Sequence, residues 1–402
     1  MNILLITSLY PGYPNQPRNE VSYAIHYFAR EWSKDGHNVL VIRPWGYFGG
    51  VFNIFRKGRK QRVHAFSDDF LLDDVKIFRY PMKRVPTRYH SHSTIKKASD
   101  DIIRMMKTTH FEPDVIVCHM INPSLFICKE LKEKLNKPLV LGMHNSDRFY
   151  LREKRNHCRF EELVSTIDAI AFRSEAIRKE YVNYPFGHIP RNQFIAYSGI
   201  EGSLILEDQE TIAKAERHIN SIMIAANLIS LKNVDVLIEA FAQLNAHHLT
   251  LTIVGDGPER GRLEKLAKKL QVYDRVDFVG NKNRNHVLQY MEKANVFAMV
   301  SSPETFGLVY IEAMAKGCIT IGSKGEGIDG VIEDGENGFL CKAGDVKALT
   351  SVLESILSLD KATKTRIISN AIDTARNLTQ ENVSREYYHN LRAILCNSKG
   401  CR

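Results

Sequence analysis

The chain has 402 residues, too many for one ordinary domain, and its length favours two domains. Hydrophobic residues make up 44% of the chain and charged residues 25%, and no run approaches the roughly 18 apolar residues that cross a membrane, so the composition excludes a disordered chain and a membrane-spanning protein. The seven cysteines form no Cys-x-x-Cys pair and several lie in apolar runs, which indicates reduced thiols in a cytosolic protein.

The positive charge of the chain is concentrated in its first half. Residues 1–200 contain 31 Lys and Arg against 20 Asp and Glu, a net charge of +11, whereas the remainder contains 24 against 26, a net charge of −2. The basic residues are densest over 55–62 and 80–97. Such a surface attracts phosphates, nucleic acid or anionic lipid headgroups, although an ordinary solvated surface carries charge as well.

Short apolar runs alternate with helical patterns along the first half. We expect buried parallel strands in five such runs, at 2–7, 38–43, 114–119, 138–144 and 168–172. The first of these runs has no basic residue before it, so it predicts a strand and not a signal peptide. Between the first two runs, apolar residues at helical spacing predict a helix over 21–36 that ends at Gly36.

The same alternation restarts after a break near 198–212. Strands are expected at 221–227, 249–255, 276–280, 295–301 and 318–323. Helices are expected at 234–244, 258–270 and 287–294. Two successive arrays of this kind predict an α/β protein with two doubly wound, Rossmann-like domains that face each other across a crevice.

Three glycines after the expected strand at 249–255 approach a dinucleotide-binding motif. Gly255, Gly257 and Gly261 have the spacing G-x-G-x-x-x-G, Pro258 is expected to start the helix, and the unit lies deep in the chain rather than at a first strand. The motif therefore does not predict a nicotinamide cofactor. Small residues before a helix N-terminus still leave room for a ligand near the helix amides.

Two carboxylates, Glu304 and Glu312, lie eight positions apart in an otherwise apolar stretch of small residues. Thr305 is expected to cap a helix that runs to Lys316 and ends at Gly317. Eight helical residues span about 12 Å. Glycosidase carboxylates lie only about 5 to 9.5 Å apart, so this pair is poorly placed to share one glycosidic bond.

The two carboxylates could instead hold the two ends of one long polar ligand. The helix N-terminus between them offers the amides of Phe306, Gly307 and Leu308, which suit a phosphate group. A ligand with hydroxyls at both ends and an anion in the middle is a nucleotide sugar. The alternative is that Glu304 and Glu312 are surface carboxylates, since Glu is mostly exposed.

The segment 301–340 resembles the E-x7-E signature region of the retaining glycosyltransferases of family 4, which have the GT-B fold. Further stretches are similar to that family in the same order along the chain: 137–147, 194–201, 231–241, 253–267, 276–281 and 377–395. The resemblance implies an N-terminal acceptor-binding domain over 1–203 and a C-terminal domain over 204–382 that binds a nucleotide sugar. It also implies that a last helix, at about 383–402, packs back on the first domain.

The resemblance implies roles for individual residues. Glu312 would accept hydrogen bonds from the ribose hydroxyls, and Glu304 would hold hydroxyls of the donor sugar. Lys232 would neutralise the departing diphosphate, and His144 would lie near the reacting face of the sugar. The other residues expected at the donor are Gly12, Asn227, Gly255, Gly280, Asn281, Lys282, Thr305, Phe306, Gly307 and Leu308. Without the resemblance, Lys232 would be read as a solvated loop lysine, and His144, like His119, as a strand-ending histidine that bonds the backbone.

Two positions depart from the family pattern. Asn227 stands where the family usually has an arginine, five residues before Lys232, and it carries no charge. The first loop, which contains Gly12, lacks the usual paired glycines, although Arg18 in that loop could supply the missing phosphate contact. These departures leave open a weak or inactive enzyme.

Other residues of the first half are candidates for the acceptor and membrane side. The stretch 44–62 mixes aromatic and basic residues, and Trp45 and Phe48 would enter headgroups while Arg56 and Lys57 bind anionic lipid. An ordinary loop packed on its domain is the alternative. Asp147 and Arg148 either line the acceptor side or begin a helix. No nucleic-acid motif is present, so that partner is not expected.

Together these features predict a retaining glycosyltransferase that moves a sugar from a UDP- or GDP-linked donor to a hydroxyl of a glycan. The family setting implies a lipid-linked acceptor in the assembly of a capsule, O-antigen or similar envelope polysaccharide, by an enzyme on the cytoplasmic face of the membrane. No Asp-x-Asp motif occurs, so neither an obligatory metal nor another cofactor is expected. The alternatives are a nucleotide-sugar epimerase of the same fold and a nucleotide-sugar-binding subunit without turnover.

Overall fold

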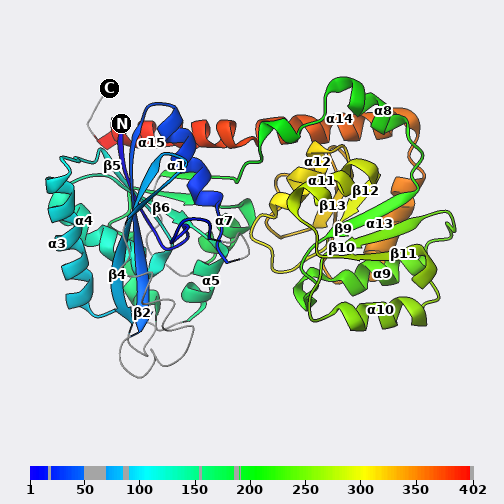
Figure 1. The fold of residues 1–402 in the computed structure, drawn as a ribbon, viewed down its shortest axis with the longest axis horizontal. Coiled ribbons are helices and arrows are strands. Elements are labelled where there is room, and N and C mark those ends of the chain that lie inside the picture. Colours follow the sequence, from blue (N-terminus) through cyan, green and yellow to red (C-terminus); the bar gives the residue numbers. More distant parts are fainter. Residues whose placement is uncertain are drawn as a thin grey trace. The chain divides into compact units, whose positions relative to one another are not determined.

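The structure is a computed structural model that describes residues 1–16, 20–48, 69–84, 90–153, 156–184, 190 and 192–398. The chain divides into two compact units. The first comprises Met1–Arg173, Ile177–Tyr197 and Gln380–Arg402, and the second comprises Ser174–Ala176 and Ser198–Thr379. Each unit is built around its own sheet (Figure 1).

The sheet of the first unit has eight strands in the order β3-β4-β2-β1-β5-β6-β7-β8, all parallel except for the antiparallel pair β3 and β4. Its strands are β1 Asn2–Thr7, β2 Asn38–Phe48, β3 Phe70–Leu72, β4 Val75–Arg84, β5 Val115–His119, β6 Leu139–Met143, β7 Ala169–Phe172 and β8 Asn192–Ile195. Strands β1, β5, β6 and β7 are buried almost throughout, which explains their continuous apolar sequences.

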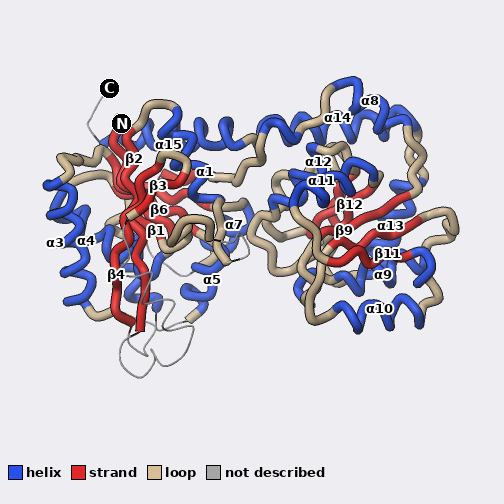
Figure 2. Tube along the Cα trace, viewed as in Figure 1, coloured by secondary structure: helices blue, strands red, loops and turns tan. Residues whose placement is uncertain are grey.

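Helices cover the sheet of the first unit (Figure 2). They are α1 Ala24–Lys34, α3 His92–Thr108, α4 Phe126–Leu135, α5 Asn145–Arg152, α6 His157–Val164, α7 Glu175–Val182 and α15 Gln380–Ser398, with a π-helical turn η2 at Ile121–Leu125. The final helix α15 packs on α1, where the indole N–H of Trp32 donates to the carbonyl of Ser384 at 3.0 Å and Tyr387 lies edge-on to Phe28 and Trp32.

The second unit has a parallel sheet of six strands in the order β11-β10-β9-β12-β13-β14. Its strands are β9 Ser221–Ala225, β10 Thr250–Val254, β11 Val276–Gly280, β12 Val296–Ala298, β13 Ile319–Ser323 and β14 Phe339–Cys341. Its helices are α8 Asp208–Glu216, α9 Val234–Gln243, α10 Arg260–Lys269, α11 Arg284–Lys293, α12 Leu308–Ala315, α13 Val346–Leu357 and α14 Lys361–Asn377. Contacts join α9 to α10 and α13, and a separate set joins α14 to α8 and α12, so helices form two layers.

The structure shifts the bounds of several predicted elements, among them one strand and two helices near predicted site residues. Strand β2 continues to Phe48, because residues 44–48 pair with residues 80–84 of β4. Helix α10 begins at Arg260 rather than at Pro258. Helix α12 begins at Leu308 rather than near Phe306, because Gly307 adopts φ = +79° and no helical residue can precede it directly.

Candidate functional site

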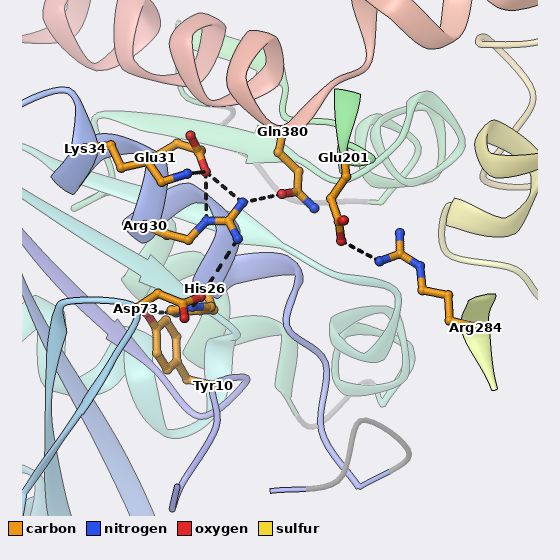
Figure 3. A network of polar contacts seen from close by, with 9 residues as sticks. All are labelled: Tyr10, His26, Arg30, Glu31, Lys34, Asp73, Glu201, Arg284 and Gln380. Atoms are coloured by element: carbon orange, nitrogen blue, oxygen red, sulfur yellow. Dashed lines mark hydrogen bonds and ion pairs between the residues drawn. The ribbon is translucent and has the colours of Figure 1, made fainter. Parts of the chain in front are cut away.

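The loop after β1 is held by a chain of polar side chains, of which Tyr10 and His26 are fully buried. The hydroxyl of Tyr10 lies 2.8 Å from Nδ1 of His26, and Nε2 of His26 lies 2.9 Å from Oδ2 of Asp73 (Figure 3). Arg30, on the same helix as His26, bonds Gln380 at the start of α15. These contacts fix the loop to α1, which in turn packs on α15.

Gly12 lies in this loop, in a position that a larger residue could not occupy. A Cβ atom there would lie 1.8 Å from the ring of Trp45. Its amide donates to Oε1 of Gln16 at 2.8 Å, and its carbonyl accepts from Arg79 at 3.1 Å. The role predicted for Gly12 at the donor phosphates therefore cannot use its amide in this arrangement.

Trp45 is a core residue and does not face a membrane. It is 8% exposed, and the guanidinium of Arg43 lies over its ring at 4.2 Å. The prediction that Trp45 enters lipid headgroups is wrong, because the strand that carries it continues through this position and turns the ring toward the loop of Gly12. Arg18, Arg56, Lys57 and the side chains of Phe48 and Arg148 lie outside the described residues.

His119 and His144 meet at the carboxyl ends of two neighbouring parallel strands, β5 and β6. Nδ1 of His119 lies 3.0 Å from Nε2 of His144, and a Cβ on Gly142 would lie 2.0 Å from Nδ1 of His119. Burial lowers the pKa of each imidazole well below its usual value, and the nearby Arg173 lowers both further. Both rings are therefore neutral near pH 7.

Asp147 braces the loops that follow these two strands. Its carboxylate accepts from the amide of Ile121 and from the amide of His144, each at 2.9 Å. Burial raises the pKa of this carboxyl to about 6, despite the two backbone hydrogen bonds, which lower it. Asp147 belongs to the first turn of α5, and His144 occupies the capping position. Of the two roles considered for Asp147, the structure therefore supports the one at the helix start.

Arg173, which sequence reasoning missed, is buried directly after β7. Its guanidinium lies over the ring of Phe28 at 5.0 Å, and burial lowers its pKa to about 10. It therefore stays charged at neutral pH and opposes protonation of the two histidines. A single arginine after a strand carries no sequence pattern that would have revealed this.

A small cavity lies beside the loop after β5. Its volume is about 170 Å³. Its wall combines the ring of Phe126 with cationic and acidic side chains from three helices, among them His92, Lys129, Glu130 and Arg159. The guanidinium of Arg159 lies 5.1 Å from the centre of the Phe126 ring.

In the second unit, Lys232 and Glu304 form an ion pair. Lys232 ends a short 3₁₀ turn after β9, and Glu304 follows the neighbouring strand β12. The ammonium of Lys232 lies 2.6 Å from Oε2 of Glu304, and the Ser301 hydroxyl donates to the same oxygen at 3.2 Å. Both charged side chains are less than one-quarter exposed, so the pair is shielded from bulk water but still accessible.

The loop that carries Glu304 is fixed by Glu326, a second residue missed from the sequence. Glu326 accepts from the amide of Glu304 and from the hydroxyl of Ser302, both at 2.7 Å. The next residue, Gly327, lies so close to the backbone of Thr305 that a Cβ atom on it would be 2.1 Å from the Thr305 carbonyl oxygen. The prediction that Thr305 caps α12 is wrong, because Gly307 occupies the capping position.

The N-terminus of α12 follows directly. Gly307 holds the capping position without a side chain, and the amide of Tyr310 makes the first hydrogen bond of the turn, to the carbonyl of Gly307 at 3.0 Å. The amides of Gly307 and Leu308 precede that bond. The amides of Gly307 and Leu308 therefore remain the candidates for the predicted phosphate contact, one residue later than expected.

Glu312 is paired with an arginine that the sequence did not reveal. Nε of Arg284 lies 2.9 Å and Nη2 lies 2.8 Å from Oε1 of Glu312. Nη1 of the same guanidinium lies 2.6 Å from Glu201 (Figure 3). Both predicted carboxylates of the second unit therefore have a cationic partner.

The remaining predicted donor residues follow strands β9, β10 and β11. A Cβ on Gly255 would lie 1.9 Å from the carbonyl oxygen of Ala226, and its amide donates to Gly280 at 2.9 Å, so the glycine is required for the close approach of two loops. Asn227, Asn281 and Lys282 are exposed. Their side chains lie on loops at the same sheet edge as Lys232 and Glu304.

Within the described residues, no group of three or more His, Cys, Asp or Glu side chains is arranged to hold a metal ion. Among the helices that the structure describes, none combines the length and the apolar character needed to cross a bilayer.

Comparison with known families identifies the chain. Residues 21–194 match the family described as Glycosyltransferase Family 4, and residues 208–374 match the family described as Glycosyl transferases group 1. The two matches cover both arrays of strands and helices. The chain belongs to the family 4 glycosyltransferases. The predicted enzyme class, glycosyltransferase, is thereby confirmed.

Curated relatives of this family 4 glycosyltransferase match over part of their length. N-acetyl-alpha-D-glucosaminyl L-malate synthase of Bacillus anthracis is 36% identical over 137 residues, which cover 34% of this chain and 35% of that protein. The lipopolysaccharide core biosynthesis glycosyltransferase LpsE of Rhizobium meliloti is 33% identical over 153 residues, which cover 38% of this chain and 44% of that protein. The matched segments thus span less than half of these relatives.

Solved structures match over almost the whole chain. HepE of Anabaena, crystallised with UDP, superposes with a TM-score of 0.70 at 19% identity and covers 98% of this chain and 100% of its own. The sucrose-phosphate synthase of Thermosynechococcus elongatus also reaches a TM-score of 0.70, at 18% identity, and the match covers 98% of this chain and 99% of that protein's chain. These likenesses confirm the predicted GT-B fold with its two Rossmann-like sheets.

Proposed function

We propose that the protein is a retaining glycosyltransferase that uses a nucleoside-diphosphate sugar, UDP- or GDP-linked, as donor. The main support for this proposal is the Lys232–Glu304 ion pair near the N-terminus of α12. It places a cation, a carboxylate and the first amides of a helix at one sheet edge of the second unit. A diphosphate requires cationic and amide donors, and a sugar requires a hydrogen-bond acceptor, so this site offers both within one short segment.

The donor would be held at both ends. In the proposed arrangement Glu312 accepts hydrogen bonds from the ribose, Glu304 binds hydroxyls of the sugar, and the amides of Gly307 and Leu308 bind the diphosphate. Lys232 would move from Glu304 toward the diphosphate as negative charge develops on the leaving group. Crystal structures of HepE from Anabaena contain UDP and UDP-glucose, which supports a nucleotide donor of this kind.

The acceptor is proposed to be a hydroxyl of a glycan, bound by the first unit. His144 is neutral and buried, so it would act through hydrogen bonding rather than as a cation. The departing diphosphate would then take the acceptor proton on the face where the new bond forms, and no separate protein base is required. The cavity beside Phe126 offers an aromatic ring and polar groups suited to a sugar unit of the acceptor.

The proposed setting is assembly of an envelope polysaccharide, such as a capsule or O-antigen, on a lipid-linked acceptor. The printed names of two relatives, LpsE and the putative colanic acid glycosyltransferase WcaL of Salmonella typhimurium, support this setting. The excess of basic residues in the first half would favour a cytoplasmic enzyme associated with the inner, anionic face of the membrane.

A labelled donor tests the proposal. The protein is incubated with labelled UDP- and GDP-sugars and a membrane lipid extract, and products are separated by solvent extraction. Label that enters the lipid fraction supports transfer, and an isomerised donor would instead identify an epimerase. Donor binding with neither product would indicate a binding subunit, an outcome that the uncharged, exposed Asn227 favours. A Glu304→Gln variant serves as the negative control.

A further inference from the structure

Arg284 occupies a position where an arginine does not stabilise its own helix. It is the first residue of α11, after the cap Asn283, whose side chain accepts from the amide of His286 at 3.0 Å. A cation at a helix N-terminus is opposed by the helix dipole, and the first turn of α11 contains no acidic residue to offset it. The reason for this arginine must therefore lie outside α11.

Two carboxylates from other elements hold the guanidinium. Glu312, on α12, receives two of its N–H groups on a single oxygen, at 2.9 Å from Nε and 2.8 Å from Nη2. Glu201 receives Nη1 at 2.6 Å (Figure 3). The exposed fractions of the side chains are 13% for Glu312, 30% for Arg284 and 42% for Glu201, so the contact to Glu312 is the more shielded of the two.

The planar guanidinium restricts the carboxylate of Glu312 because two of its donors converge on one oxygen. Glu201 contributes by limiting where the guanidinium can lie. It lies next to Ile200, which bridges to Thr379, so its own backbone is anchored.

We propose that Arg284, held by Glu201, is the positioning residue that orients Glu312 toward the ribose of the nucleotide. This inference rests on the proposed function, since it assigns the ribose to Glu312. Arg284 acts through Glu312 rather than on the reacting atoms. Its effect must therefore depend on the ribose hydroxyls, whereas a purely structural role would weaken every nucleotide equally.

Calorimetric titration with UDP and with 2′,3′-dideoxyuridine diphosphate tests this dependence, with the guanosine pair used if the protein prefers GDP. Arg284→Met should weaken binding of the ribonucleotide about tenfold, the size of one hydrogen bond to a charged group. Binding of the dideoxy nucleotide should change less than twofold or so. Glu201→Gln, which keeps the side-chain shape, should weaken the ribonucleotide by about threefold with the same selectivity.

Arg376→Met provides the matched control. Arg376 also lies between two carboxylates, at 2.6 Å from Asp208 and 2.8 Å from Asp373, but neither of these is among the predicted donor residues. Its removal should leave both affinities unchanged. Equal losses for the two nucleotides in Arg284→Met, or no loss for either, would overturn the inference alone. If the unaltered protein bound neither UDP nor GDP, the proposed function would fail with it.

Discussion

In the first unit, His119, His144 and Asp147 are buried, and they hydrogen-bond to one another's rings or backbone. In the second unit, Glu304 and Glu312 are partly exposed and each is paired with a cation. Desolvation shifts the pKa values of the buried groups. Replacing one of their hydrogen-bond partners by a ligand would leave buried polar atoms without a partner. The ion pairs of the second unit can exchange a partner for a ligand at lower cost.

The two sheet edges therefore suit different tasks. The first presents a buried pair of neutral imidazoles that favours recognition by shape and hydrogen bonding, as expected for a glycan. The second presents charges that a diphosphate and hydroxyl groups could share. The following changes should act differently on the two edges.

The largest effect is expected for Glu304→Gln. It removes the negative charge that pairs with Lys232 and weakens the contact to the donor sugar, so kcat/KM for transfer should fall by about 100-fold. The free energy of unfolding should change by less than about 1 kcal/mol, because the pair is partly exposed. Steady-state kinetics and urea unfolding measure the two quantities. Unchanged kinetics would remove Glu304 from the site.

A methyl group at Gly142 should disrupt the histidine pair of the first unit. The Cβ of Gly142→Ala would lie 2.0 Å from Nδ1 of His119, so we expect a loss of about 2 kcal/mol in the free energy of unfolding. Gly261→Ala is the control, since nothing lies within 4 Å of the added atom, and in helix α10 it should stabilise by about 0.5 kcal/mol. Similar values for the two variants, measured by urea unfolding, would show that the His119 ring can move aside.

The stability of the protein should fall on acidification, because the folded-state pKa values of His119 and His144 lie below the unfolded value. Their contribution is complete above pH about 6.5 and is lost as pH falls toward the lower folded values, at about 1.4 kcal/mol per pH unit for each group. Asp147 has the opposite effect. Because its pKa is raised to about 6 in the folded state, the folded state gains stability from this group as the pH falls from 6 to 4.

Urea unfolding at pH 7, 6 and 5 measures this dependence. His144→Gln should reduce the slope of the free energy of unfolding against pH by the contribution of one titrating group. The same slope in His144→Gln as in the unaltered protein would show that His144 does not change its protonation on unfolding.

The smallest change expected is a gain. Asn227→Arg restores a charge at an exposed position of the loop after β9, so affinity for a nucleoside diphosphate should rise by about threefold at low salt. The gain should disappear near 1 M salt, where exposed charges are screened. A gain that persists at high salt would point to a shape effect rather than to charge.

The sequence predicted buried strands well where both faces are covered, since the continuous apolar runs 2–7 and 114–119 match β1 and β5 to within one residue. It did not predict β4 at Val75–Arg84, because basic residues interrupt that strand. It found Glu304, Glu312 and Lys232 through a motif. It missed Arg284, Glu326 and Arg173 because their partners lie far away along the chain, and local spacing cannot show such contacts.

In the proposed function, the acidic residues of the second unit bind a nucleotide. A thermal-shift titration with UDP and GDP, on the unaltered protein and on Glu312→Ala, tests it most directly. We predict that one nucleotide raises the melting temperature of the unaltered protein and that the rise is lost, or shrinks by more than half or so, in Glu312→Ala. An equal rise in both proteins, or no rise with either nucleotide, would contradict the account.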